Sequence, residues 1–445
     1  MRKNTLFCCL VALAGTFYLA PKAMAVPSYA RQTGLSCNAC HYTPPELNPA
    51  GRLFKLYGYV QKMKQGGITA ESSKRESGLD LLANLPLSAW LETSFTNTEA
   101  PQPGTQNGNV EFPQDISLFL AGAWSTHIGS FLQVTYDTQG DHFSMDNTDI
   151  RFAKQTKLAG KELAWGVTLN NNPTVEDLWN DTPAWGFPFI ASDVAPTPTA
   201  GPIIAGALGQ DVGGVGAYAM WNQHLYFAGT LYRSSHIGTT QPSDGADFGF
   251  NIRGVAPYWR VAWQQNGIKN NLEVGTYGMH MTSTPGAVVG LEDTYTDVAA
   301  DFQYDRVLGK DVLSLRGTYI HESSALAASL DAGAAGFSDH HLNAFNTNAE
   351  YHFGNRYSTA FGWFTTTGTT DPLLFTQAEV TGSANGSPQS AGYTANFSVW
   401  PIQNLDLAFQ YTGYTRFNGM ATNYDAAGRN ASGNNTVYLL ARFVF

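Results

Sequence analysis

The chain ends in Thr436-Val437-Tyr438-Leu439-Leu440-Ala441-Arg442-Phe443-Val444-Phe445, and this stretch decides the fold class. Every second residue from Val437 to Phe445 is apolar, whereas Thr436, Tyr438 and Arg442 fall on the opposite face. A strand of a transmembrane β-barrel shows this period because its residues face lipid and lumen in turn. A C-terminal aromatic residue also suits the machinery that inserts outer-membrane barrels. We therefore predict an all-β outer-membrane barrel.

The same alternation recurs along the chain and predicts sixteen strands. Segment 161–171 places Leu163 and Val167 outward and Thr168 and Asn170 inward. Each predicted strand is close to the ~9–11 residues that cross a membrane at barrel tilt, and an even number suits bacterial single-chain barrels. The predicted strands are 87–97, 115–125, 128–137, 145–154, 161–171, 212–222, 223–234, 255–265, 270–281, 295–305, 310–322, 343–353, 356–367, 391–400, 404–415 and 434–445.

The connections between these segments alternate in length, which predicts the orientation of the barrel. Barrels keep short turns in the periplasm and long loops outside, and the first connection here is long. Strand one therefore runs outward, and both ends of the barrel domain are predicted to be periplasmic. A soluble sandwich or propeller would also alternate, but sandwich strands are usually shorter and no blade-length repeat is found. The predicted long polar loops are 98–114, 172–211, 235–254, 323–342, 368–390 and 416–433.

Composition supports the barrel and excludes other classes. Only 13% of residues are charged, about half the usual share, while 13% are aromatic and 45 are glycine. After the N-terminal leader, no apolar run approaches the ~20 residues of a transmembrane helix. The net charge of −10 argues against nucleic acid as a partner.

The N-terminus has the pattern of a secretory signal peptide. Arg2 and Lys3 precede a mostly apolar run over 6–20, and Ala23-Met24-Ala25 offers a cleavage site. Residues 1–25 are therefore predicted to be removed. Cys8 and Cys9 lie within this leader, so the mature chain keeps only two cysteines.

Those two cysteines stand in Cys37-Asn38-Ala39-Cys40-His41, the attachment signature of a c-type haem. The two thiols add to the porphyrin vinyl groups, and His41 becomes the proximal iron ligand. A zinc site would require a second ligand pair, and a redox disulfide would require a βαβ context. We predict one covalent haem c in a segment over 26–64, a linker over 65–86 and the barrel over 87–445.

Other residues of this segment are candidate partners of the haem. Pro49 to Lys55 predicts a short helix that offers Leu53, Phe54 and Tyr57 to the macrocycle. Arg52 is a candidate partner of the haem propionates, as are Arg31 and Lys55, although each can also be a solvated cation. Met63, the only methionine between leader and barrel, is a candidate sixth iron ligand that would raise the potential. An inward histidine such as His352, or water, is the alternative.

The N-terminal segment closely resembles the outer-membrane fused monohaem cytochrome–porins of iron-oxidising bacteria. The resemblance rests on Ala30-Arg31-Gln32-Thr33-Gly34, Cys37 to His41, Pro45-Glu46-Leu47 and Gly51-Arg52-Leu53-Phe54-Lys55. Beyond these residues it is architectural. It implies an Fe(II):cytochrome c-type oxidoreductase that takes electrons from extracellular Fe(II) and passes them to a periplasmic cytochrome c or similar acceptor. It also implies thioether bonds at Cys37 and Cys40 and iron ligation by His41.

Two other functions remain open: a diffusion porin with a haem plug or sensor, and the same conduit with a different donor. Charges of both signs on the inward face indicate a lumen filled by protein. Loop carboxylates are candidates for holding the hard cation Fe(II), although ordinary solubilising charge also explains them. These loop carboxylates are Glu99, Glu176, Asp177, Asp181, Glu292 and Asp293. The predicted lumen residues are Glu92, Asp115, Asp149, Arg151, Arg260, Glu273, Asp297, Asp301, Arg316, Glu350, Asp406 and Arg442.

Overall fold

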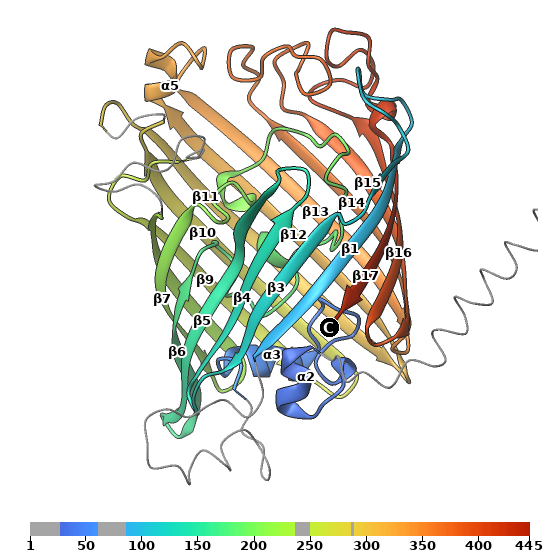
Figure 1. Ribbon diagram of the computed structural model, residues 1–445. Coiled ribbons are helices and arrows are strands. Elements are labelled where there is room, and N and C mark those ends of the chain that lie inside the picture. The colour runs from blue at the N-terminus through green and yellow to red at the C-terminus, as the bar shows by residue number, and fades with distance from the viewer. Residues whose placement is uncertain (1–26, 61–85, 236–249, 286–288) are drawn as a thin grey trace, which may run out of the picture.

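A computed structural model of the chain describes residues 27–60, 86–235, 250–285 and 289–445. One antiparallel sheet closes into a barrel, because each long strand pairs with its neighbour in sequence and β17 pairs with β1 (Figure 1). The predicted signal peptide, Met63 and nearly all of the predicted linker lie outside the described residues. Among the described residues, no helix has both the length and the apolar character to cross a membrane.

The elements follow in chain order. They are α2 (Ser28–Thr33), η1 (Cys37–Ala39), α3 (Pro49–Leu56), β1 (Leu87–Thr98), β2 (Asn109–Glu111), β3 (Asp115–Ala123), β4 (Ile128–Asp137), β5 (His142–Leu158), β6 (Lys161–Asn170), η2 (Pro183–Trp185), η3 (Ile203–Ala205), β7 (Val212–Trp221), β8 (Leu225–Ser234), β9 (Ala256–Asn266), β10 (Asn270–Ser283), β11 (Asp293–Leu308), β12 (Asp311–Leu326), α5 (Ala327–Asp331), β13 (Asp339–Phe353), β14 (Tyr357–Gly368), β15 (Ser390–Ile402), β16 (Leu405–Arg416), η4 (Ala431–Asn434) and β17 (Thr436–Val444).

The sixteen-stranded barrel predicted from the alternation is confirmed, since each predicted segment coincides with one long strand. The structure adds the three-residue strand β2 inside the predicted first loop. Both β2 and β3 pair with β1, through Ser94–Glu111 and Leu91–Ile116. Strands β2 and β3 therefore lie one after the other along the same edge of β1. Pro113 lies between the two and has no N–H to donate to the ladder.

The two faces of the strands differ in burial as the alternation predicts. In β17 the side chains of Tyr438 and Arg442 are buried, whereas Leu439 is exposed on the outer face. Every predicted lumen residue is buried except Asp115, which is half-buried. Lumen charges pair across neighbouring strands, and the register that closes the barrel places Glu92 opposite Arg442. The outer face is therefore apolar, and the inner face carries the buried charges together with some apolar side chains.

Short turns and long connections lie at opposite ends of the barrel. The short-turn end contains 124–127, 159–160, 222–224, 267–269, 309–310, 354–356 and 403–404. The other connections form the long-loop end, where 138–141 between β4 and β5 is the one short member. Helices α2 and α3 lie at the short-turn end, and β17 ends toward the same side (Figure 1).

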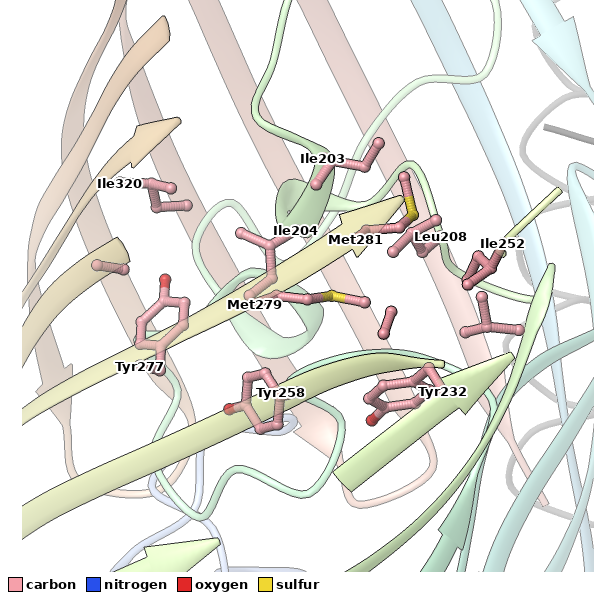
Figure 2. Close-up of a cluster of buried hydrophobic side chains, with 13 residues drawn as sticks. Ile203, Ile204, Leu208, Tyr232, Ile252, Tyr258, Tyr277, Met279, Met281 and Ile320 are labelled. Carbon is pink, nitrogen blue, oxygen red and sulfur yellow. The ribbon is translucent and has the colours of Figure 1, made fainter. Parts of the chain in front are cut away.

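The connection between β6 and β7, residues 171–211, folds into the lumen; we call it the inward loop. The expectation of an external polar loop here is wrong. Its Ile203, Ile204 and Leu208 pack on Tyr258 and Met279 of the inner wall (Figure 2). Burial of such side chains stabilises the loop inside the barrel. Consequently Glu176, Asp177 and Asp181 are buried in the lumen and do not lie among external loops.

Candidate functional site

Residues 27–60, the N-terminal segment, form a compact unit around the Cys-X-X-Cys-His turn. Helix α2 ends at Gly34, which adopts the left-handed conformation common after helix C-termini. Helix α3 begins at Pro49, and the side chain of Asn48 caps it by accepting from the N–H groups of Ala50 and Gly51. The predicted helix over Pro49 to Lys55 is confirmed.

Buried polar contacts hold the N-terminal segment inside the barrel. Arg52 pairs with Asp305 of β11 at 2.6 Å. The hydroxyl of Tyr59 donates to Asp149 of β5 at 2.6 Å. These wall residues belong to strands separated by several others around the sheet. The N-terminal segment therefore bridges two parts of the barrel wall.

A second group of contacts centres on Glu46. Its carboxylate pairs with Arg316 of β12 and lies 3.1 Å from Nε2 of His352 on β13. The Thr43 hydroxyl lies 3.0 Å from Nδ1 of the same His352. Burial raises the pKa of Glu46 well above its usual value, and the charge of Arg316 opposes this shift. His352, considered above as an alternative sixth ligand, is occupied by these contacts and does not line the cavity beside Cys37 and Cys40.

The Cys-X-X-Cys-His turn presents two thiols and one imidazole in a fixed arrangement. The N–H groups of Cys40 and His41 both donate to the Cys37 carbonyl, at 3.1 and 3.0 Å. Nδ1 of His41 lies 3.2 Å from the Pro45 carbonyl oxygen. As the donor in that bond, Nδ1 carries the proton and leaves Nε2 free to ligate a metal. Burial lowers the pKa of His41, which favours the neutral, ligating form.

Helix α3 approaches this turn closely at one glycine. A Cβ atom at Gly51 would collide with the carbonyl oxygen of Cys40. The Asn48 N–H donates to the same carbonyl at 2.9 Å, and the Asn48 side chain donates to the Ala39 carbonyl at 3.1 Å. The cap of α3 and the Cys-X-X-Cys-His turn are therefore one hydrogen-bonded unit.

A cavity of about 560 Å³ lies beside Cys37, Cys40 and His41. It is enclosed by the N-terminal segment, the inward loop and the inner faces of β1, β3, β4 and β17. Its size falls in the range of small-molecule and cofactor sites. Burial raises the pKa of both free thiols. The aromatic residues that line it include Tyr29, Phe54, Trp90, Phe119, Phe131 and Trp185.

The cavity fits the haem predicted from the sequence. Paired free thiols and an adjacent imidazole are the groups of the c-type haem attachment signature, and an aromatic wall suits a flat, apolar macrocycle. Of the three helix residues expected to face a macrocycle, Phe54 lines the cavity. Leu53 and Tyr57 instead pack against a cluster that joins Trp179 of the inward loop to Tyr218 and Tyr226 of the barrel wall.

The cations predicted near the haem take different positions. Arg52 does not line the cavity, because its guanidinium contacts Asp305 and the Leu47 carbonyl. Lys55 does line it, and so does Arg442 of β17, which the sequence placed in the lumen without a role. Lys55 donates to the Val175 carbonyl at 2.7 Å and lies 4.6 Å from the centre of the Trp185 ring.

Comparison with known proteins identifies the fold. No protein-family model and no curated protein matches the chain. Among solved structures, OmpF of Salmonella typhi, in complex with daunomycin, aligns with 81% of this chain and 97% of its own at 10% identity, with a TM-score of 0.50. The barrel has the porin fold. An anion-selective porin from Comamonas acidovorans (12% identity, 81% of this chain, 98% of its own, TM-score 0.46) and the channel DcaP of Acinetobacter baumannii (11%, 81%, 97%, 0.46) were also found.

Proposed function

We propose that the protein is an electron conduit of the outer membrane. It takes electrons from extracellular Fe(II) through a single haem c held by Cys37, Cys40 and His41. It passes them to a periplasmic cytochrome c or a similar acceptor. The observation that carries the proposal is the aromatic cavity beside these three residues, inside a barrel of porin fold.

The architecture supports the location and direction. Apolar outer faces such as that of β17 suit contact with outer-membrane lipid, and barrels of this kind keep short turns in the periplasm. The N-terminal segment would then lie at the periplasmic end, where a soluble acceptor can dock. Fe(II) would approach from the long-loop end. Oxidation near the surface keeps insoluble ferric product out of the cell.

Each part of the cavity has a separate role in this proposal. The bound haem supplies a centre that gains and loses one electron. Cys37 and Cys40 would hold the haem by thioether bonds, and the Pro45 carbonyl, by binding Nδ1 of His41, would leave Nε2 to ligate the iron. Trp90, Phe119 and Phe131 limit access of water, and a low-dielectric surrounding tunes the potential of a haem.

A diffusion porin with a haem plug or sensor is the second candidate, and the porin fold of the barrel supports it. Packing in the lumen argues against a wide, open pore. Arg151, Arg260 and Arg316 project inward from strands, yet each has 1% or less of its surface exposed. A water-filled channel would leave such side chains hydrated. At these positions the lumen is occupied by the N-terminal segment and the inward loop.

The test uses the purified full-length protein in detergent under anaerobic conditions. We expect the thioether-haem absorption bands to show reduction when Fe(II) is added. The Cys37→Ser/Cys40→Ser variant should lack covalent haem. If Fe(II) leaves the haem oxidised while small solutes pass freely through proteoliposomes, the porin function is correct. If another donor reduces the haem much faster than Fe(II), the conduit has a different physiological donor.

A further inference from the structure

Arg260 of β9 lies in the lumen among four carboxylates. Its Nη2 is 2.7 Å from Asp301, 3.0 Å from Asp177, 3.3 Å from Glu273 and 3.6 Å from Asp181. Asp177 and Asp181 come from the inward loop, whereas Glu273 and Asp301 come from β10 and β11. All five side chains are buried. We call these residues the Arg260 cluster.

The Arg260 cluster has more negative charge than its guanidinium can balance. Neither carboxylate oxygen of Asp177 or Asp181 has a donor in good hydrogen-bond geometry among the described residues, and the same holds for Oε2 of Glu273; Thr182 lies near Asp177, and Asp181 lies near Glu273. Several buried carboxylates around a single cation carry a large desolvation cost unless a proton or a further cation compensates them. Burial accordingly raises the pKa of Asp177 to about 6 and that of Asp181 well above its usual value.

Two glutamines flank Glu273 in the register of the sheet. Glu273 lies directly opposite Gln264 of β9 on one side and Gln303 of β11 on the other. Both glutamines are at least 97% buried, and the side-chain carbonyl oxygen of each has no donor among the described residues. Carboxylate and carbonyl oxygens together are the donor set of hard divalent cations. A single proton shared by two carboxylates is the alternative to a cation, but it would give a bonding partner to fewer of these oxygen atoms.

A glycine lies beside two carboxylates of the Arg260 cluster. Gly275 faces the lumen between Glu273 and Tyr277, opposite Asp301. A Cβ atom there would lie 2.6 Å from Oε1 of Glu273 and 2.8 Å from Oδ1 of Asp301. The absence of a side chain at Gly275 therefore lets the two strand carboxylates lie close to the backbone, where an alanine side chain would displace them.

We propose that Asp181, Glu273 and Asp301 bind one divalent cation. The three residues offer oxygen atoms that all lie within 4.8 Å of one another. Asp177, a further member of the Arg260 cluster, contacts Arg260 and also lines the cavity beside Cys37 and Cys40, so the cluster extends to the wall of that cavity. The identification of the ion as Fe(II) rests on the proposed function; on that basis the site holds the electron donor next to the haem.

The test measures binding of Mn(II), a redox-stable probe with the same ligand preference, to the oxidised full-length holoprotein. Electron paramagnetic resonance should show one bound Mn(II) per chain, which added Fe(II) displaces. Asp181→Asn/Glu273→Gln should weaken binding by at least about tenfold, because affinity follows the number of charged ligands. Gly275→Ala keeps every carboxylate but displaces the two on the strands, and it should weaken binding as well.

The matched control is Asp297→Asn/Glu322→Gln, a second buried lumen pair. These carboxylates accept the N–H groups of Ile204 and Ile203, so they hold the inward loop by another contact. This control should leave Mn(II) affinity within about twofold of wild type. Haem absorption and thermal unfolding establish that each variant is folded. If the double variant does not fold, Asp181→Asn alone, on the inward loop, replaces it.

The two proposals fail in different ways. Absence of tight Mn(II) binding to wild type, or equal binding by the Asp181→Asn/Glu273→Gln variant, overturns the cation site even if Fe(II) still reduces the haem. Specific Mn(II) binding without reduction of the haem by Fe(II) upholds the cation site and overturns the conduit. If both hold, the double variant should slow reduction by Fe(II) and leave reduction by dithionite unchanged.

Discussion

Nη2 of Arg52 lies 2.6 Å from Oδ2 of Asp305, and both side chains are buried between helix α3 and strand β11. The Tyr42 hydroxyl also donates to Asp305, at 3.3 Å, and the Ser314 hydroxyl donates to it at 3.0 Å. The Gln303 amide donates to it as well, at 3.0 Å, so Asp305 receives two donors from the N-terminal segment and two from the barrel wall. This carboxylate is a principal point at which the two parts of the chain are joined.

Replacement of Arg52 should loosen the N-terminal segment. Arg52→Met leaves Asp305 buried without its guanidinium partner, and breaking a buried ion pair costs about 3–5 kcal/mol. Hydrogen exchange of backbone amides over 42–57 should accelerate accordingly, because local opening becomes easier. The double variant Arg52→Met/Asp305→Asn removes both charges and should recover more than half of the lost protection.

The control for this prediction is an exposed ion pair on the same barrel. Arg253 and Glu292 lie 2.8 Å apart, but their side chains are 47% and 37% exposed. Arg253→Met should change stability by less than about 1 kcal/mol, since solvent screens such pairs. Equal effects of Arg52→Met and Arg253→Met would contradict the role assigned to Asp305.

Gly51→Ala should impair haem attachment. In an ordinary helix this change would be stabilising by roughly 1 kcal/mol. Here the added methyl group would strike the Cys40 carbonyl and displace the turn that presents the thiols. We expect a lower ratio of covalent haem to protein, measured by haem absorbance after denaturation. Ala50→Gly, at the exposed neighbouring position, should retain full attachment.

Stability should rise with pH between about 7 and 10 because of Lys55. Burial, followed by repulsion from Arg151, lowers the pKa of Lys55 from 10.5 to about 7. Within this window the unfolded chain holds the proton and the folded chain does not, so raising the pH favours folding. Below pH 7 both states are protonated and the contribution is constant.

Urea unfolding followed by tryptophan fluorescence checks this dependence, because Trp185 lies next to the Lys55 ammonium group. Lys55→Met should flatten the rise in the free energy of unfolding between pH 7 and 10. Lys161→Met, at an exposed lysine, should leave the rise intact. An unchanged slope in Lys55→Met would show that another group titrates in this range.

The barrel could be predicted because its signal is local. In β17 the polarity of each residue indicates which face of the sheet it lies on. The alternation of Tyr438 and Leu439 can therefore be recognised without knowing where distant strands lie. The inward loop could not be predicted in this way, since its apolar residues are irregularly spaced. The one available signal is its apolar residues Ile203, Ile204 and Leu208, which an external polar loop would not be expected to contain.

In the candidate site, too, the residues that are adjacent in sequence could be predicted, whereas contacts between distant segments could not. Cys37, Cys40 and His41 are contiguous, so the sequence alone predicts their chemistry. Arg52 was predicted to reach a propionate, whereas its observed partner Asp305 lies on a distant strand. Which side chains pair inside a barrel depends on how the sheet closes, and a single sequence carries no local signal of that closure. Strand register likewise brings Glu273 and Asp301 together, and the fold of the inward loop adds Asp181.

Arg151 joins three parts of the molecule, and its removal should open the lumen. Its guanidinium donates to Asp149 of β5 at 2.7 Å, to the Lys55 carbonyl at 3.2 Å and to the Glu176 carbonyl at 2.7 Å. Arg151→Leu would leave Asp149 without its guanidinium partner and loosen both the N-terminal segment and the inward loop, at a cost of about 3–5 kcal/mol. Single-channel conductance in planar bilayers should increase as a result.

The control is Arg151→Leu/Asp149→Asn, which removes the buried carboxylate charge but restores neither carbonyl contact. It should recover stability while conductance stays above that of wild type. Wild-type conductance in both variants would mean that other contacts suffice to keep the lumen filled.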